Sequence, residues 1–101
     1  MRSEGDVKKE IRKVLDAVVG LWYFMPAANG FGAPGIPDFV GAYKGKAFTI
    51  EAKFGSGKQS MWQKKQQKLI SASGTPYLLI DEHNVVILLG LLGIRVGEAH
   101  C

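Results

Sequence analysis

The chain has 101 residues, 47% of them hydrophobic, and carries a formal net charge of +4 at pH 7. These values predict one globular domain over residues 1–101. They argue against a membrane protein, because the longest apolar stretch, Val85 to Ile94, is too short to span a bilayer. The polar start of the chain is unlike a signal peptide, and the single cysteine, Cys101, gives no disulfide framework, so we expect a cytoplasmic protein.

The N-terminal part of the chain predicts a helix, a short strand and a long loop. Residues 3–19 carry apolar side chains at helical spacing, with Ser3 as the N-cap and Gly20 as the end. The bulky side chains of residues 21–25 are typical of a short strand. Residues 26–37 are rich in proline and glycine and predict a loop, and long ordered loops in small domains are often functional.

The remainder of the chain predicts four further strands and a second helix. Residues 38–43 and 46–53 should form two strands joined by a hairpin at Lys44-Gly45. A second helix follows at 59–72. Two apolar strands come last, at 77–80 and 85–89. The order is then αβββαββ, which predicts an α/β domain with a central mixed sheet flanked by helices.

Three charged residues near the central hairpin could form a catalytic site. Strand alternation points Glu51 and Lys53 to the same face, and Asp38 can join them from the neighbouring strand. Two carboxylates can hold a hard divalent ion, and a lysine beside them can orient or deprotonate a water. This is the equipment needed to hydrolyse a phosphodiester. The alternative is a hairpin whose Glu–Lys pair faces solvent.

A lysine-rich segment surrounds these residues. Between Lys44 and Lys68 the only acid is Glu51, and the segment favours a polyanionic partner such as DNA. Apart from Lys53, the lysines that we expect to contact DNA are Lys44, Lys46, Lys58, Lys64, Lys65 and Lys68. The alternative is a solvated helix face, which is the usual role of such a segment.

Five sequence blocks occur in a characteristic order. They are Ser3-Glu4-x-x-Val7, Trp22 to Gly32, Gly35-Ile36-Pro37-Asp38, Ile50-Glu51-Ala52-Lys53 and a downstream Gln63. Together they resemble a VRR-NUC domain, the virus-type replication–repair nuclease group of the PD-(D/E)xK superfamily. The resemblance covers residues 3–80. The turn after Lys53 departs from the group, because it is richer in glycine than is typical.

The resemblance implies a restriction-endonuclease-like fold that uses Mg²⁺ or Mn²⁺. The site residues that it implies are Asp38, Glu51, the carbonyl of Ala52 and Glu4 around the metal, Lys53 as the catalytic lysine, and Gln63 as the helix glutamine. Members of this group include stand-alone phage proteins that look like homodimers, and some act on branched DNA such as four-way junctions. We therefore expect a metal-dependent deoxyribonuclease that works as a homodimer.

Several of these assignments have alternatives. Glu4 lies on the apolar face of the first helix and is a better site residue than Glu10, but it could simply compensate the helix dipole. Gln63 could be an ordinary surface glutamine. The apolar run 85–94 could be a dimer interface or part of the core. The alternative function is a non-catalytic nucleic-acid-binding module, which would need no metal.

Overall fold

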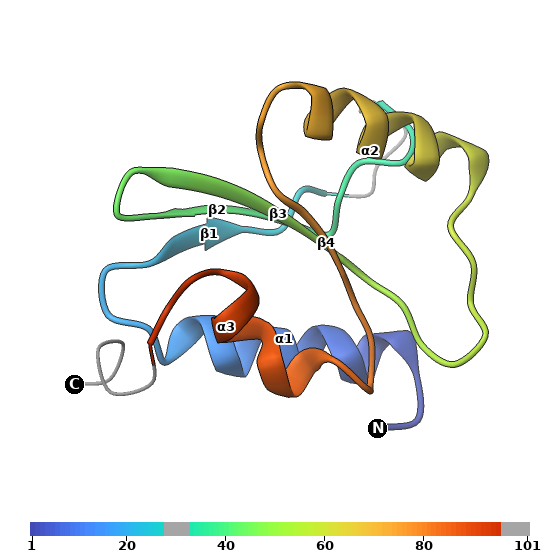
Figure 1. Cartoon of the computed structure of the whole chain (residues 1–101). Coiled ribbons are helices and arrows are strands. Elements are labelled where there is room, and N and C mark those ends of the chain that lie inside the picture. The colour runs from blue at the N-terminus through green and yellow to red at the C-terminus, as the bar shows by residue number, and fades with distance from the viewer. Residues whose placement is uncertain (28–32, 96–101) are drawn as a thin grey trace.

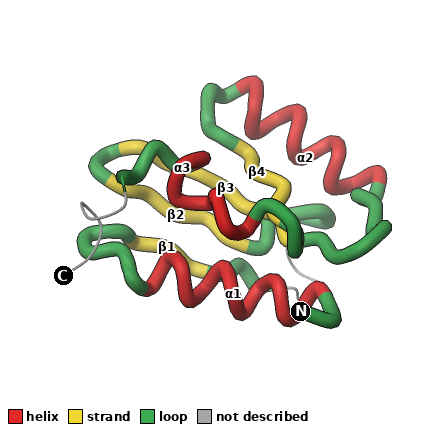
Figure 2. The backbone as a smooth tube through the Cα atoms, turned by 60° about the horizontal axis from the view of Figure 1, so that its bottom comes forward, coloured by secondary structure: helices red, strands yellow, loops and turns green. Residues whose placement is uncertain are grey.

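The structure, a computed structural model, describes residues 1–27 and 33–95 and contains one sheet between helices (Figure 1). In chain order the elements are α1 (Glu4–Asp16), β1 (Trp22–Phe24), β2 (Phe39–Tyr43), β3 (Lys46–Ala52), α2 (Met61–Ala72), β4 (Tyr77–Ile80), the 3₁₀ helix η1 (Val85–Ile87) and α3 (Leu88–Leu91). The sheet order is β1-β2-β3-β4, antiparallel except for the parallel pair of β3 and β4. α1 and α3 lie on one face of the sheet and α2 on the other (Figure 2). The expected α/β class with a mixed central sheet is therefore confirmed.

α1 supplies the core on its face of the sheet. Ser3 caps the helix, since its hydroxyl accepts a hydrogen bond from the Asp6 N–H at 3.1 Å. Val7, Ile11 and Leu15 recur one helical turn apart and are at most 1% exposed. They pack in one cluster with core residues of β2, β3 and β4. Within the described residues, no helix is long and apolar enough to cross a membrane.

β3 is the central strand, and both of its faces are covered towards its end. The hairpin before it has positive φ angles at Lys44 (49°) and Gly45 (81°), as two-residue hairpins of right-handed twist require. Phe48 and Ile50 belong to the core cluster with α1. Because side chains alternate along a strand, Glu51 points to the opposite face, towards α2, yet it is also buried.

The segment 85–89 is not a strand, so the expected order αβββαββ is wrong at its last element. η1 and α3 occupy this segment instead. The preceding turn explains the difference. The Asp81 N–H donates to Asn84 Oδ1 at 2.7 Å, the Asn84 N–H donates to Asp81 Oδ1 at 3.0 Å, and the Val85 N–H donates to the Asp81 carbonyl at 3.1 Å. These bonds begin a helical turn, and a short apolar run fits a strand and a buried helix equally well.

Candidate active site

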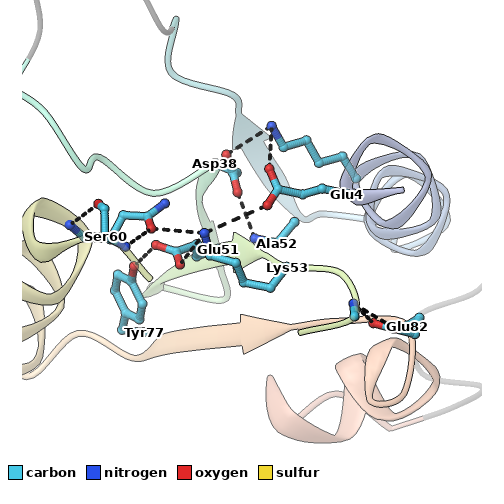
Figure 3. A network of polar contacts seen from close by, with 11 residues as sticks. Glu4, Asp38, Glu51, Ala52, Lys53, Ser60, Tyr77 and Glu82 are labelled. Carbon is cyan, nitrogen blue, oxygen red and sulfur yellow. Dashed lines mark hydrogen bonds and ion pairs between the residues drawn. The ribbon is translucent and has the colours of Figure 1, made fainter. Parts of the chain in front are cut away.

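The five side chains expected at the site converge where four elements begin or end, and Figure 3 labels four of them, Glu4, Asp38, Glu51 and Lys53. Glu51 lies near the end of β3 and Lys53 directly after that strand, while Asp38 directly precedes β2. Glu4 begins α1, and Gln63 lies in the first turn of α2. The elements come from both faces of the sheet, so only the folded chain forms this site.

Glu51 is the most constrained residue of the group. Its side chain is 0% exposed, and the Tyr77 hydroxyl donates a hydrogen bond to its Oε1. Its other oxygen, Oε2, has no hydrogen-bond partner among the described residues and lies 3.8 Å from Lys53 Nζ. Burial raises the pKa of the Glu51 carboxyl, although the Tyr77 hydrogen bond and the Lys53 charge act in the opposite direction. A buried carboxylate with one oxygen that lacks a hydrogen bond is costly to keep, which is typical of a functional group.

Asp38 ties the start of β2 to the end of β3. Its Oδ2 accepts a hydrogen bond from the Ala52 N–H at 2.8 Å. Its Oδ1 lies 3.3 Å from Lys8 Nζ. The carboxylate is thus held by the backbone of the residue that follows Glu51, and it stays partly accessible, with 22% of the side chain exposed.

Lys53 lies at the centre of the polar network. Its Nζ donates a hydrogen bond to Gln63 Oε1 at 3.0 Å. The same nitrogen lies 3.8 Å from Glu51 Oε2 and 3.9 Å from Glu4 Oε1. The ammonium group therefore connects β3 with α1 and α2, and it lies where a lysine could contact a phosphate bound beside the carboxylates.

Gln63 has two functions in the structure. Its Oε1 accepts from the Ser60 N–H at 2.8 Å, while the Gln63 N–H donates to Ser60 Oγ at 3.1 Å, which forms a capping box for α2. Because the same Oε1 binds Lys53, the start of α2 and the lysine are positioned together. The glutamine side chain is therefore in direct contact with Lys53.

A close approach of the loop before Asp38 holds α2 in place. Gly35 has a φ of +79°, and a Cβ on it would lie 2.4 Å from the carbonyl carbon of Trp62. Only glycine fits there. The rest of the proline- and glycine-rich loop, which we expected to be functional, lies partly outside the described residues.

Glu4 reaches the site from a more exposed position than expected. It is in line with the buried stripe of α1, but 45% of its side chain is exposed. Its Oε1 faces Lys53 and its Oε2 lies 3.9 Å from Lys8 Nζ. Glu10, in contrast, lines a separate pocket with Val14 and Val85, to which none of the five site residues contributes.

Sequence reasoning missed two residues of this network, Lys8 and Tyr77. Lys8 lies between the carboxylates of Asp38 and Glu4. Its spacing of four residues from Glu4 on one helix could have indicated this. Tyr77 is placed beside Glu51 by the parallel pairing of β3 with β4, in which it lies opposite Thr49. No local pattern in the sequence predicts that register.

The expected DNA-binding lysines divide into three groups. Lys58 and Lys64 line a pocket of about 340 Å³ together with Lys53. Lys64, Lys65 and Lys68 line one side of α2. Lys44 and Lys46 lie at the hairpin, and Lys46 is about 17 Å along β3 from Glu51 at the usual rise per residue. The structure thus places Lys58 and Lys64 beside Lys53, whereas no site residue lines the pocket of Lys65 and Lys68, and the hairpin pair lies farther away.

The chemistry of the site suits a hard divalent cation. Mg²⁺ and Mn²⁺ prefer oxygen ligands, and Mg²⁺ often takes only one or two protein carboxylates and keeps several waters. The unpaired Oε2 of Glu51 and the carboxylate of Asp38 supply such ligands. In the part of the chain that the structure describes, no three acidic, His or Cys side chains form a ready-made metal cluster. The ammonium groups of Lys8 and Lys53 lie between the carboxylates instead.

Comparisons with known proteins add no relative. No model of a known protein family matches this chain, and none of the curated proteins matches it.

Proposed function

We propose that this chain is a metal-dependent nuclease that hydrolyses phosphodiester bonds in DNA. The observation that carries the proposal is the Glu51 carboxylate, which is fully buried and has one oxygen that lies beside Lys53 and forms no hydrogen bond within the described part of the chain. A chain selected only for stability would replace such a group, because an unsatisfied buried acceptor costs about 1–3 kcal/mol. Its retention is understandable if the oxygen binds a cation.

Each residue of the site has its own role in the proposed reaction. Asp38 and Glu51, with the carbonyl of Ala52 and with Glu4 nearby, would hold Mg²⁺ or Mn²⁺. The ion, when bound, polarises a phosphate and lowers the pKa of a water. Lys53 positions that water or neutralises charge on the phosphate, and Gln63 keeps the ammonium group in place. The raised pKa of Glu51 falls once a cation neutralises its surroundings.

The lysines beside the site would bind the DNA backbone. Lys58 and Lys64 share a pocket with Lys53, and Lys65 and Lys68 extend the positive surface along α2. Such contacts supply affinity without sequence preference. Selectivity for branched or four-way-junction DNA would then come from shape and from the pairing of two chains.

The proposal also includes the expected fold, the expected location and the expected homodimer. The mixed sheet with helices on both faces is compatible with a restriction-endonuclease-like fold of the VRR-NUC group, and we propose that this chain acts in the cytoplasm. A homodimer would place two sites on one branched substrate. Val86 and Ile87 on η1 are 83% and 55% exposed, and Leu91 on α3 is 45% exposed. This apolar patch is the surface that a second copy would cover, and light scattering of the purified chain tests it.

A cleavage assay tests the nuclease proposal. We expect Asp38→Ala and Glu51→Gln to abolish Mg²⁺-dependent cleavage of single-stranded, duplex, flap and four-way-junction DNA, while DNA binding persists because the lysines remain. Glu4→Gln should slow cleavage strongly, and Glu10→Gln is its matched control on the same helix. Cleavage that persists in EDTA or in the Asp38 variant would refute the proposal.

One observation favours the alternative, a non-catalytic nucleic-acid-binding module. Lys8 and Lys53 already neutralise the carboxylates, so the fold needs no cation. Calorimetric titration with Mn²⁺ separates the two functions. A nuclease binds the ion through Asp38 and loses binding in Asp38→Ala, whereas a binding module takes up no ion at this site.

A further inference from the structure

Two large aromatic side chains on β1 lie open to solvent. Trp22 is 61% exposed and Phe24 is 46% exposed, and their ring centroids are 5.6 Å apart. Tyr23 between them points the other way and packs against Phe39, with ring centroids 5.9 Å apart. The strand thus contributes one aromatic side chain to the core and leaves two outside it.

The register of the sheet places this pair on the same face as the candidate site. Phe24 lies opposite Val40, and Val40 lies opposite Thr49, so all three share one face. Glu51 is two residues beyond Thr49 and therefore also on this face. Two strand spacings across the sheet and two residues along β3 separate the Cα atoms of Phe24 and Glu51 by about 12 Å.

The strand residues between the pair and the site carry no negative charge. Trp22 lies opposite Ala42, which lies opposite Ala47, so small side chains surround the rings. In the described chain, α2 packs chiefly on β4, and no helix covers this face over β1 and β2 (Figure 1, Figure 2). Among the strand residues of this face, Glu51 is the only acid.

We infer that Trp22 and Phe24 form a stacking platform for unpaired bases of the DNA strand whose phosphate is bound at the candidate site. The platform presupposes the proposed function, since it assigns a substrate class to that same site. Exposed aromatic rings beside a cationic groove bind single strands in this way, because every base has a π face. The separation of about 12 Å corresponds to about three or four nucleotides of a stacked strand.

A second copy of the chain fits this surface less well. Even full burial of two aromatic side chains removes only about 300–500 Å² from water, whereas a stable interface needs about 800 Å² from each partner. A nucleic-acid strand needs no such area, because Lys53, Lys58 and Lys64 on the α2 side of the sheet supply its phosphate contacts. The platform therefore favours substrates with unpaired nucleotides, such as flaps or splayed branch arms, over continuous duplex.

Tryptophan fluorescence tests the inference directly, because the chain has only two tryptophans. Trp62→Phe leaves Trp22 as the sole tryptophan, and Trp22→Phe leaves Trp62. With EDTA present, so that nothing is cut, each protein is titrated with a single-stranded oligonucleotide and with a duplex of equal length. We expect the single strand to quench Trp22 strongly and the duplex to quench it weakly. An unquenched Trp22, equal quenching by both DNAs, or an emission change caused by protein concentration alone would overturn the inference.

Affinity measurements complete the test. Trp22→Ala and Phe24→Ala should each weaken single-strand binding by about 5- to 150-fold, and Trp22→Phe should largely retain it because phenylalanine also stacks. Unchanged affinity in both alanine variants, with folding checked by circular dichroism, would refute the platform. Cleavage is scored separately. If the wild type shows quenching but no cleavage, the nuclease proposal is refuted and the stacking platform is retained. If it shows cleavage but no quenching, the platform is refuted and the nuclease proposal is retained.

Discussion

Removal of the Tyr77 hydroxyl is the most informative single change at the site. That hydroxyl donates to Oε1 of Glu51, whose other oxygen has no hydrogen bond. Burial raises the pKa of Glu51, and the hydrogen bond from Tyr77 limits the rise. In Tyr77→Phe the buried carboxylate loses this partner, so the pKa of Glu51 rises further. Since Glu51 must be ionised to bind a cation, the variant should require a higher pH for activity.

The size of the effect follows from the hydrogen bond. A hydrogen bond to a charged group contributes about 1.5–3 kcal/mol, and about 1.4 kcal/mol corresponds to one pH unit, so the acidic limb of the pH–rate profile should move upward by about 1–2 pH units. The direction is upward because only the ionised form of Glu51 is stabilised by the donor. At alkaline pH the carboxylate is ionised in both proteins, and the rates should converge.

Cleavage rates of a fluorescently labelled substrate, measured at one subsaturating Mg²⁺ concentration from mildly acidic to mildly alkaline pH, provide the assay. Tyr23→Phe is the matched control, because Tyr23 donates to Asp16 Oδ1 at 2.6 Å at an exposed position away from Glu51. The acidic limb of the pH–rate profile of Tyr23→Phe should not move. An unshifted limb in Tyr77→Phe, or a rate reduced by one factor at every pH, would show that Tyr77 does not act through the ionisation of Glu51.

Three further predictions concern stability and DNA binding. Because the pKa of Glu51 is raised above 4.5, the folded chain retains a proton that the unfolded chain releases, and stability is lost as the pH rises through this range. Glu51→Gln should therefore increase the free energy of unfolding in EDTA at neutral pH but not at acidic pH. Urea denaturation measures this, and an equal increase in the free energy of unfolding at both pH values would contradict the reasoning. Gly35→Ala should lower the free energy of unfolding by about 1–3 kcal/mol and slow cleavage. The reason is that Gly35 has a φ of +79°, and an added Cβ would lie 2.4 Å from the backbone of Trp62. An unchanged urea midpoint would show that the loop accommodates the alanine. Lys58→Ala should reduce the log–log salt slope of DNA binding by about 1, while Lys46→Ala leaves it unchanged; the opposite ranking would place the DNA at the hairpin.

Local sequence patterns were sufficient to predict the elements that depend on residues close together in the chain. The Ser3 cap, the helical stripe of α1 and the two-residue hairpin at Lys44-Gly45 all depend on residues within a few positions of one another. The shared face of Glu51 and Lys53 follows from strand alternation alone. For this reason the central part of the candidate site could be predicted before any long-range contact was known.

Only the tertiary structure decided the features that depend on distant pairing. The parallel register of β4 brings Tyr77 to Glu51, and the covering of β3 on both faces removes that carboxylate from water. The bonds around Asp81 turn the apolar segment after them into helix rather than strand. Sequence periodicity reports which side of an element is apolar, but register and burial depend on what lies opposite, and this is determined by contacts between residues far apart in the chain.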